Sequence, residues 1–195
     1  MRVLIANILD HPVLLELDLS NNIISDRGAR AIGKFLNNHS QLRRLSVVDN
    51  NIRAAGAQAI AHALTKNTML TALDLRLNHL GDDGGQAVCR ALLKNATLVE
   101  LGLGSNELTE PTAALLSQVI VQNRALRKID LSCNRLGPVR EAVDVYIRVD
   151  EAFSLFNLYT LWFNVHSSTP SARDGRFLVD RRHFLELLCR QTETD

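Results

Sequence analysis

Aromatic residues, cysteines and an excess of either charge are all scarce in this chain. Its 195 residues include one tryptophan, two tyrosines, six phenylalanines and three cysteines, which are Cys89, Cys133 and Cys189. The odd number and wide spacing of the cysteines argue against a disulfide framework or a paired-cysteine site, so a reducing, intracellular compartment fits best. The 22 lysines and arginines nearly balance the 21 aspartates and glutamates, and the net charge of +1 gives no basic field that would attract nucleic acid.

Long apolar runs are missing as well. No run reaches the roughly 18 apolar residues that a membrane helix needs, and residues 1–10 are too short and too polar for the core of a signal peptide. We therefore expect a protein that is neither secreted nor inserted in a membrane. The apolar share of 46% is still large enough to build a continuous core.

Patterns typical of catalysis or metal binding are also absent from the sequence. The six histidines are scattered, and none has a helix-face spacing to another histidine or to a cysteine that indicates a metal site. There is no phosphate-binding glycine loop, and no serine or cysteine has a recognisable base beside it. The adjacent Asp82 and Asp83 are explained by the start of a helix, where the dipole favours negative charge. We predict no catalytic residue, no cofactor, no metal and no small-molecule substrate, so the chain is not expected to be an enzyme.

What the sequence does contain is a pattern that returns every 28 residues. Each unit begins with a leucine and carries an asparagine eight residues later. A period of this kind is typical of leucine-rich repeats, in which every unit buries its apolar face against its neighbours. The leucines are Leu14, Leu42, Leu70, Leu98 and Leu126, and the asparagines are Asn22, Asn50, Asn78, Asn106 and Asn134.

Each unit reads as a strand followed by a helix. Leucines spaced three and then two apart, as at Leu14, Leu17 and Leu19, place the last two on one face of a short strand. The later apolar spacing of three to four, as at Ile32 and Leu36, predicts a helix. We predict an α/β leucine-rich repeat solenoid, a horseshoe of about five 28-residue strand-helix units, with parallel strands on the concave face and helices on the convex face.

Glycines and prolines mark the expected helix starts. Glycine stands at the strand-to-helix boundary at Gly28, Gly56 and Gly84. In the fourth unit Thr109-Glu110-Pro111-Thr112 replaces it, a capping residue and a proline that suit a first helical turn.

The two ends depart from the repeat. Leu4 and Ile8 stand 28 residues before Ile32 and Leu36, so residues 1–13 are expected to be the helix of a truncated preceding repeat, ahead of an array over 14–137. Eight of the nine aromatics lie at or after Tyr146, and we predict that residues 138–195 form a divergent aromatic-rich C-terminal cap or tail. A docking segment for a partner is the alternative reading of these aromatics.

The five asparagines are expected to be structural. Where the chain turns out of each strand, backbone groups lack ladder partners, and an amide side chain can satisfy groups of its own unit and of the next.

The concave face is the expected partner-binding surface. Alternation along each strand directs polar residues of both signs outward. Gly102 and Gly104 leave a floor without side chains, where either a partner approaches closely or the glycines relieve crowding. Arg76 would lie at the edge of this floor, where its guanidinium group could donate two hydrogen bonds to a partner carboxylate. The candidate residues are Asp18, Arg44, Asp74, Arg76, Gly102, Gly104, Lys128 and Asp130.

The units resemble the ribonuclease-inhibitor-like class of leucine-rich repeats. Within that class they are similar to the T-complex-associated testis-expressed family, the leucine-rich repeat subunits of the nexin–dynein regulatory complex of motile cilia. The helix start at Glu110-Pro111-Thr112-Ala113 is the most specific feature, since the repeat consensus does not demand it. The stretches that carry the similarity are 26–32, 75–78, 84–87, 106–113, 115–119 and 131–134.

The resemblance implies a non-enzymatic scaffold for protein–protein interaction. It would lie in the cytoplasm and cytoskeleton, in the axoneme of a cilium or flagellum, with other subunits of the regulatory complex as partners and a role in dynein-driven motility. Two alternatives stay open. Ran GTPase-activating proteins share this repeat class, so a small-GTPase regulator is one; a cytosolic innate-sensor-like repeat fragment is the other.

Overall fold

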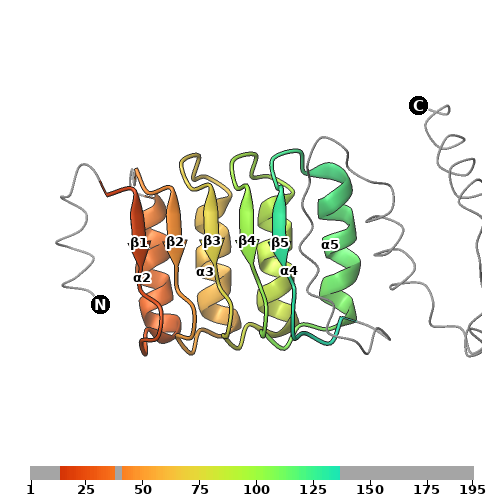
Figure 1. Ribbon diagram of the computed structural model, residues 1–195, viewed down its shortest axis with the longest axis horizontal. Helices are drawn as coiled ribbons and strands as arrows, with labels where there is room; N and C mark the ends of the chain where they lie inside the picture. The colour runs from red at the N-terminus through yellow and green to blue at the C-terminus, as the bar shows by residue number, and fades with distance from the viewer. Residues whose placement is uncertain (1–13, 38–40, 137–195) are drawn as a thin grey trace, which may run out of the picture. The chain divides into compact units, whose positions relative to one another are not determined.

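The computed structural model describes residues 14–37 and 41–136, in which strands and helices alternate along the chain (Figure 1). The strands are β1 (Glu16–Asp18), β2 (Arg44–Ser46), β3 (Ala72–Asp74), β4 (Glu100–Gly102) and β5 (Lys128–Asp130). The helices are α2 (Ser25–Asn37), α3 (Ala54–Leu64), α4 (Gly81–Leu92) and α5 (Glu110–Gln122). Each strand is followed by a helix in the first four units, as the repeat pattern predicts.

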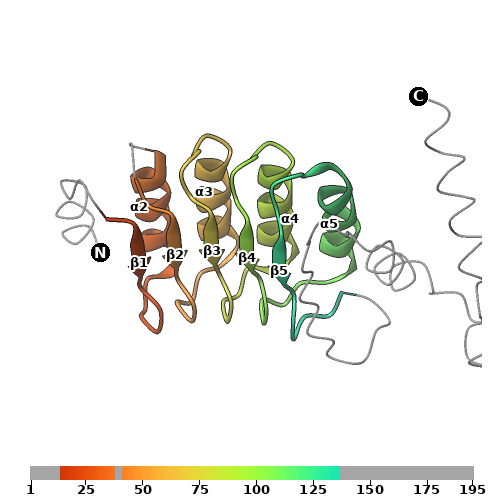
Figure 2. The same ribbon diagram turned by 45° about the horizontal axis from the view of Figure 1, so that its top comes forward.

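The strands form one parallel sheet in the order β1-β2-β3-β4-β5. Each residue pairs with the residue 28 positions later, so that Leu17, Leu45, Leu73, Leu101 and Ile129 share one row across the sheet. Figures 1 and 2 show the helices together on one side of this sheet. The predicted α/β leucine-rich repeat fold is confirmed.

The core lies between the sheet and the helices. Leu45, Leu73 and Leu101 point inward from the strands and are 2% exposed, while Ile60 and Leu92 from the helices are fully buried. Burial of each such side chain stabilises the fold by about 1.5–3 kcal/mol relative to leaving it exposed. This apolar layer fixes which residues face the opposite side of the sheet, because side chains alternate along a strand.

The glycines Gly56 and Gly84 do not precede the helices but lie inside their first turns. A β-carbon added at Gly56 would stand 2.7 Å from the Ile52 Cγ2 atom and 2.9 Å from the Ala29 Cβ atom. One added at Gly84 would stand 3.0 Å from the Ala57 Cβ atom. These glycines therefore allow neighbouring helices to pack closely, a role that the boundary interpretation did not anticipate.

Successive repeats differ in how the chain enters the helix. The backbone at Ser25 and Gly81 is left-handed, with φ of 54° and 56°, whereas Arg53 and Thr109 at the equivalent positions are extended, with φ of −109° and −127°. Isolated parallel bridges join the extended residues to the next repeat, Arg53 to His79 and Thr109 to Arg135. The geometry of the helix entrance therefore alternates from one repeat to the next.

The expectations for residues 1–13 and 138–195 lie outside the described residues, as does Gly137 at the end of the predicted array. Within the ranges that the structure describes, no helix combines the length and the apolar character needed to cross a membrane.

Candidate functional site: the strand face

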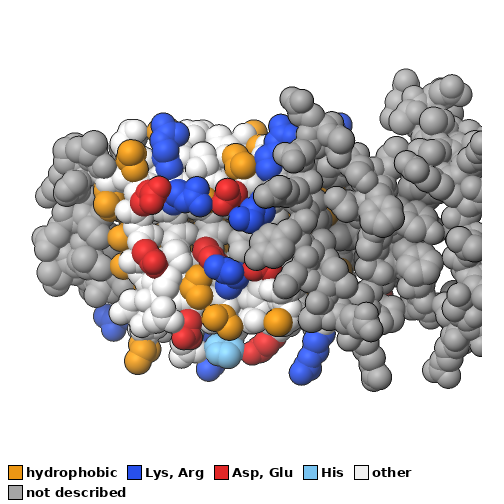
Figure 3. Space-filling model, viewed as in Figure 1, with side chains coloured by type: hydrophobic (Ala, Val, Ile, Leu, Met, Phe, Trp, Pro, Cys, Tyr) orange, Lys and Arg blue, Asp and Glu red, His pale blue; other side chains and the backbone are white. Residues whose placement is uncertain are grey.

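We call the side of the sheet opposite the helices the strand face. The pairing register arranges its side chains in two rows that cross the strands, visible in Figure 3 as bands of acidic and basic groups. The first row is Glu16, Arg44, Ala72, Glu100 and Lys128, and the second is Asp18, Ser46, Asp74, Gly102 and Asp130. Both rows lie on the outward side of the strands, as the alternation along each strand predicts.

These rows line a shallow hollow of about 430 Å³, which we call the charged hollow. Seven of the eight candidate residues border it, and Gly104 does not. The hollow holds five carboxylates against three cationic side chains, a formal charge of −2. The structure therefore brings seven of the eight predicted residues together on one polar surface.

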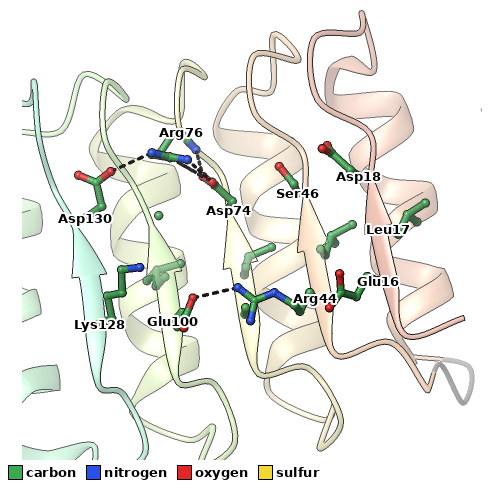
Figure 4. Close-up of a pocket in the computed structure, with 15 residues that line it drawn as sticks. Glu16, Leu17, Asp18, Arg44, Ser46, Asp74, Arg76, Glu100, Lys128 and Asp130 are labelled. Atoms are coloured by element: carbon green, nitrogen blue, oxygen red, sulfur yellow. Dashed lines mark hydrogen bonds and ion pairs between the residues drawn. The ribbon is translucent and has the colours of Figure 1, made fainter. Parts of the chain in front are cut away.

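Arg44 spans a neighbouring strand to reach an acid two strands away. Its Nη2 atom lies 3.2 Å from the Glu100 Oε2 atom, and this contact crosses β3 at the small residue Ala72 (Figure 4). The two side chains are 51% and 38% exposed, so the pair contributes at most about 1 kcal/mol. Its main effect is to fix where the charges lie.

Arg76 makes a second bridge of the same kind. Its Nε atom donates to both carboxylate oxygens of Asp74 at 2.9 and 3.0 Å, and its Nη2 atom lies 2.7 Å from the Asp74 Oδ2 atom. Its Nη1 atom lies 3.5 Å from the Asp130 Oδ2 atom, on the far side of β4 (Figure 4). The paired hydrogen bonds that we expected Arg76 to donate to a partner carboxylate are therefore made to Asp74 within the chain.

The bridge explains the two glycines on β4 and just after it. A β-carbon at Gly102 would stand 2.5 Å from the Asp74 Oδ1 atom and 3.2 Å from the Arg76 Cγ atom. One at Gly104 would stand 2.7 Å from the Ser132 Oγ atom. Of the two alternatives, the contacts support relief of crowding, because side chains from the adjacent repeats already occupy the space above the glycines.

Asp18 stands at the β1 end of the second row. Its Oδ1 atom accepts hydrogen bonds from the hydroxyl and the backbone N–H of Ser20, and the Ser20 hydroxyl lies 2.7 Å from that of Ser46. The hydrogen bonds from Ser20 lower the pKa of Asp18 and outweigh the opposing effect of burial. The carboxylate is therefore ionised at neutral pH and exposed on the strand face.

The repeated asparagines bond the backbone where each strand ends. The Asn78 amide donates to the carbonyl oxygens of Val47 and Leu75 at 2.9 Å, and its Oδ1 atom accepts from the N–H groups of Asn50 and Ile52 at 3.1 and 2.9 Å. These bonds join one repeat to the one before it, and Asn134 makes the equivalent set. Asn22 is exposed and bonds only its own repeat among the described contacts.

A second set of asparagines follows α3, α4 and α5, and the sequence interpretation missed it. Asn67, Asn95 and Asn123 each donate to a carbonyl oxygen of the preceding repeat at 2.6–2.9 Å. Each also accepts from two backbone N–H groups that lead into the next strand. Their own spacing of 28 residues was the signal that could have revealed them.

Asp26 and Asp82 act on the helix of the following repeat. The Asp26 Oδ1 atom accepts from the Arg53 N–H at 2.7 Å, and the Asp82 Oδ1 atom accepts from the Thr109 N–H at 2.9 Å. Thr109 is the N-cap residue of α5 with a proline in the first turn, as predicted, but its hydroxyl donates to Asp82 and makes no cap bond to its own helix. Asp82 does lie in the first turn of α4, as expected.

The Cys89 thiol is buried. Burial raises the pKa of the Cys89 thiol to about 12, which leaves it protonated and unreactive. Among the residues that the structure describes, no cluster of histidine, cysteine, aspartate or glutamate could hold a metal ion. The strand face presents charges and hydrogen-bonding groups held by contacts within the chain.

The register, the asparagine ladders and the layered core define the chain as a leucine-rich repeat protein. A family model described as Leucine Rich repeat matches residues 11–33, 38–61, 66–89 and 122–139. The unmatched stretch between 89 and 122 contains β4 and most of α5, so the structure adds a repeat that the family model leaves out.

The sequence is similar over a short stretch to Dynein regulatory complex subunit 5. The identity is 67% over 33 residues for the protein of Mus musculus, 64% over 33 residues for that of Homo sapiens, and 63% over 35 residues for that of Macaca fascicularis. These stretches cover 17–18% of this chain and 7% of the length of each relative.

Two solved structures share the fold. The leiomodin-1 actin-binding site 2 structure has a TM-score of 0.62 at 18% identity, covering 100% of this chain and 95% of that one. The tropomodulin C-terminal domain of Caenorhabditis elegans also has a TM-score of 0.62, at 17% identity, covering 84% of this chain and 95% of that one. At these identities the likeness concerns the fold alone.

Proposed function

We propose that this chain is a non-enzymatic interaction scaffold of the nexin–dynein regulatory complex in the axoneme of cilia or flagella. The observation that carries the proposal is the 63–67% identity to Dynein regulatory complex subunit 5 in three species. In that role the chain would help to hold the complex that regulates dynein-driven motility, and its partners would be other subunits of the complex.

The strand face supports a binding role. Its two arginine bridges hold charges of four repeats in fixed positions, so a partner would not have to order them on binding. The candidate contact residues remain Asp18, Arg44, Asp74, Arg76, Gly102, Gly104, Lys128 and Asp130. Within this set, Asp18 and Lys128 mark the two outer strands of the sheet.

The test is retention of the tagged 195-residue chain on detergent-extracted axonemes. We expect it to remain bound on axonemes that contain the regulatory complex and to wash off axonemes that lack it. Equal loss from both would contradict the ciliary role. Stimulation of GTP hydrolysis by Ran in a parallel assay would support the small-GTPase alternative instead.

A further inference from the structure

A second surface lies along the loops that follow the strands, and it is distinct from the charged hollow. There the structure contains a groove of about 800 Å³ that extends over the loops of four repeats, which we call the loop-edge groove. Its lining includes Asp49, Leu77, His79, Glu107, Cys133 and Arg135.

Leu77 is out of place in this groove by two physical criteria. Its backbone is left-handed, with φ of 55°, a conformation that disfavours residues with bulky side chains. Its side chain is also 54% exposed, so it gains little from burial in the fold. The backbone conformation therefore costs stability, and the exposed side chain recovers little of that cost.

The equivalent residues of the other repeats show which residue types the fold favours at this position. All of them are left-handed, with φ between 51° and 56°, and all are smaller and less apolar than leucine. Asparagine and aspartate tolerate this conformation because their short side chains bond the local backbone. The set is Asn21, Asp49, Leu77, Ser105 and Cys133.

Two further apolar side chains stand on loops that follow the strands, outside the residues that line the groove. Ile23 is 89% exposed in the first repeat, and Val48 is half-buried in the second. Hydrophobic groups are visible below the two charged rows in Figure 3. Exposed apolar groups arranged along an edge indicate a contact surface, whereas isolated ones need no explanation.

The charges of the groove indicate which sign of charge a bound partner segment would carry. Asp49 precedes Leu77 by one repeat and Glu107 follows it by one, and both are exposed. Arg135 stands at the far end, and the His79 Nδ1 atom lies 2.6 Å from the Glu107 Oε1 atom. With histidine neutral, the groove carries one net negative charge, and its carboxylates lie on either side of the exposed leucine.

We propose that the loop-edge groove binds an amphipathic, basic segment of a partner protein. One apolar side chain of that segment packs on Leu77, and a lysine or arginine beside it faces Asp49 or Glu107. The apolar contact supplies affinity and the carboxylates set the direction and the sign of the partner. Such binding does not depend on which complex the chain belongs to.

The test uses the full 195-residue chain and a phage-displayed library of random 12-residue peptides. We expect the selected peptides to combine an apolar residue with lysine or arginine. Leu77→Asn should weaken their affinity about tenfold, the loss expected when an anchor is removed. The matched control is Leu15→Asn, which makes the same change at an exposed leucine outside the groove; it should leave binding unchanged.

The melting temperature separates a role of Leu77 in binding from a role in folding. Leu77→Asn should melt at the same temperature as the wild type or higher, since asparagine suits the backbone better. A clear drop in melting temperature would show that the leucine serves the fold, and would overturn the proposal. Glu107→Lys should also lower the affinity for the basic peptides, and the loss of affinity should be larger at low salt.

Enrichment of acidic peptides, or equal binding to Leu77→Asn, would likewise overturn the proposal. So would a dimer of the wild-type chain that Leu77→Asn dissociates, because the occupant would then be a second copy of this chain.

Discussion

At the scale of single residues, the asparagines carry different numbers of hydrogen bonds although the sequence makes them look equivalent. The Asn78 Oδ1 atom accepts two backbone N–H groups, whereas the Asn106 Oδ1 atom is buried without a hydrogen-bond partner among the described residues. The period of 28 residues located both asparagines, but their difference depends on the alternating backbone between repeats, which no residue spacing encodes.

Asn78→Ala should therefore be more destabilising than Asn106→Ala. The first change leaves two buried N–H groups and several carbonyls without partners, and the second leaves only carbonyls. We expect the free energy of unfolding to fall by about 1–3 kcal/mol more for Asn78→Ala. Urea denaturation of the two variants measures this, and equal losses would contradict the account of the ladder.

Asp82 should make stability sensitive to acid. Burial opposes its ionisation, but the hydrogen bonds from Thr109 and Thr112 outweigh burial and lower its pKa in the folded chain. A lowered folded pKa stabilises the fold above the unfolded value of about 3.9, and this stabilisation is lost as the pH falls through the folded pKa.

The free energy of unfolding of the wild type should thus exceed that of Asp82→Asn at pH 7. The difference should shrink below about pH 4, where the wild-type carboxyl becomes protonated in the unfolded state. Denaturation curves between pH 7 and pH 3 provide the measurement. A difference that stays constant over this range would show that ionisation of Asp82 is not the cause.

At the scale of helices and strands, the spacing of apolar residues predicted the elements well. It did not predict the contacts between the elements. Spacings such as Leu14-Leu17-Leu19 were sufficient to place the strands, because alternation and burial depend on local sequence. The helix starts were placed less well, since Asp26 and Asp82 bond the entrance of the next helix 27 residues away. Contacts of that range become visible only when the repeats are stacked.

Gly56→Ala should destabilise the protein even though alanine favours helices by about 1 kcal/mol over glycine. The added methyl would collide with Ile52 and Ala29, and overpacking of this kind costs about 1–3 kcal/mol. Gln58→Ala, at an exposed position of the same helix, is the control and should be close to neutral. Thermal melts compare the two, and a stabilised Gly56→Ala variant would refute the close packing of α2 and α3.

At the scale of the whole molecule, the strand face could be predicted and its internal bridges could not. Repetition at a fixed period is enough to place Asp74, Arg76 and Asp130 on one surface. That Arg76 crosses β4 to Asp130, and that Gly102 makes room for it, depends on side-chain reach between adjacent repeats. Sequence spacing gives the columns of such a surface but not the pairing within it.

The central claim is that this face of the repeat array binds a partner in the regulatory complex. The most direct measurement is retention on complex-containing axonemes of the charge-reversal variant Asp18→Arg, compared with Asp83→Arg, which makes the same change at an exposed position of helix α4. We predict that Asp18→Arg is lost from the axonemes while Asp83→Arg and the wild type are retained. Equal retention of both variants would contradict the claim that the strand face is the binding surface.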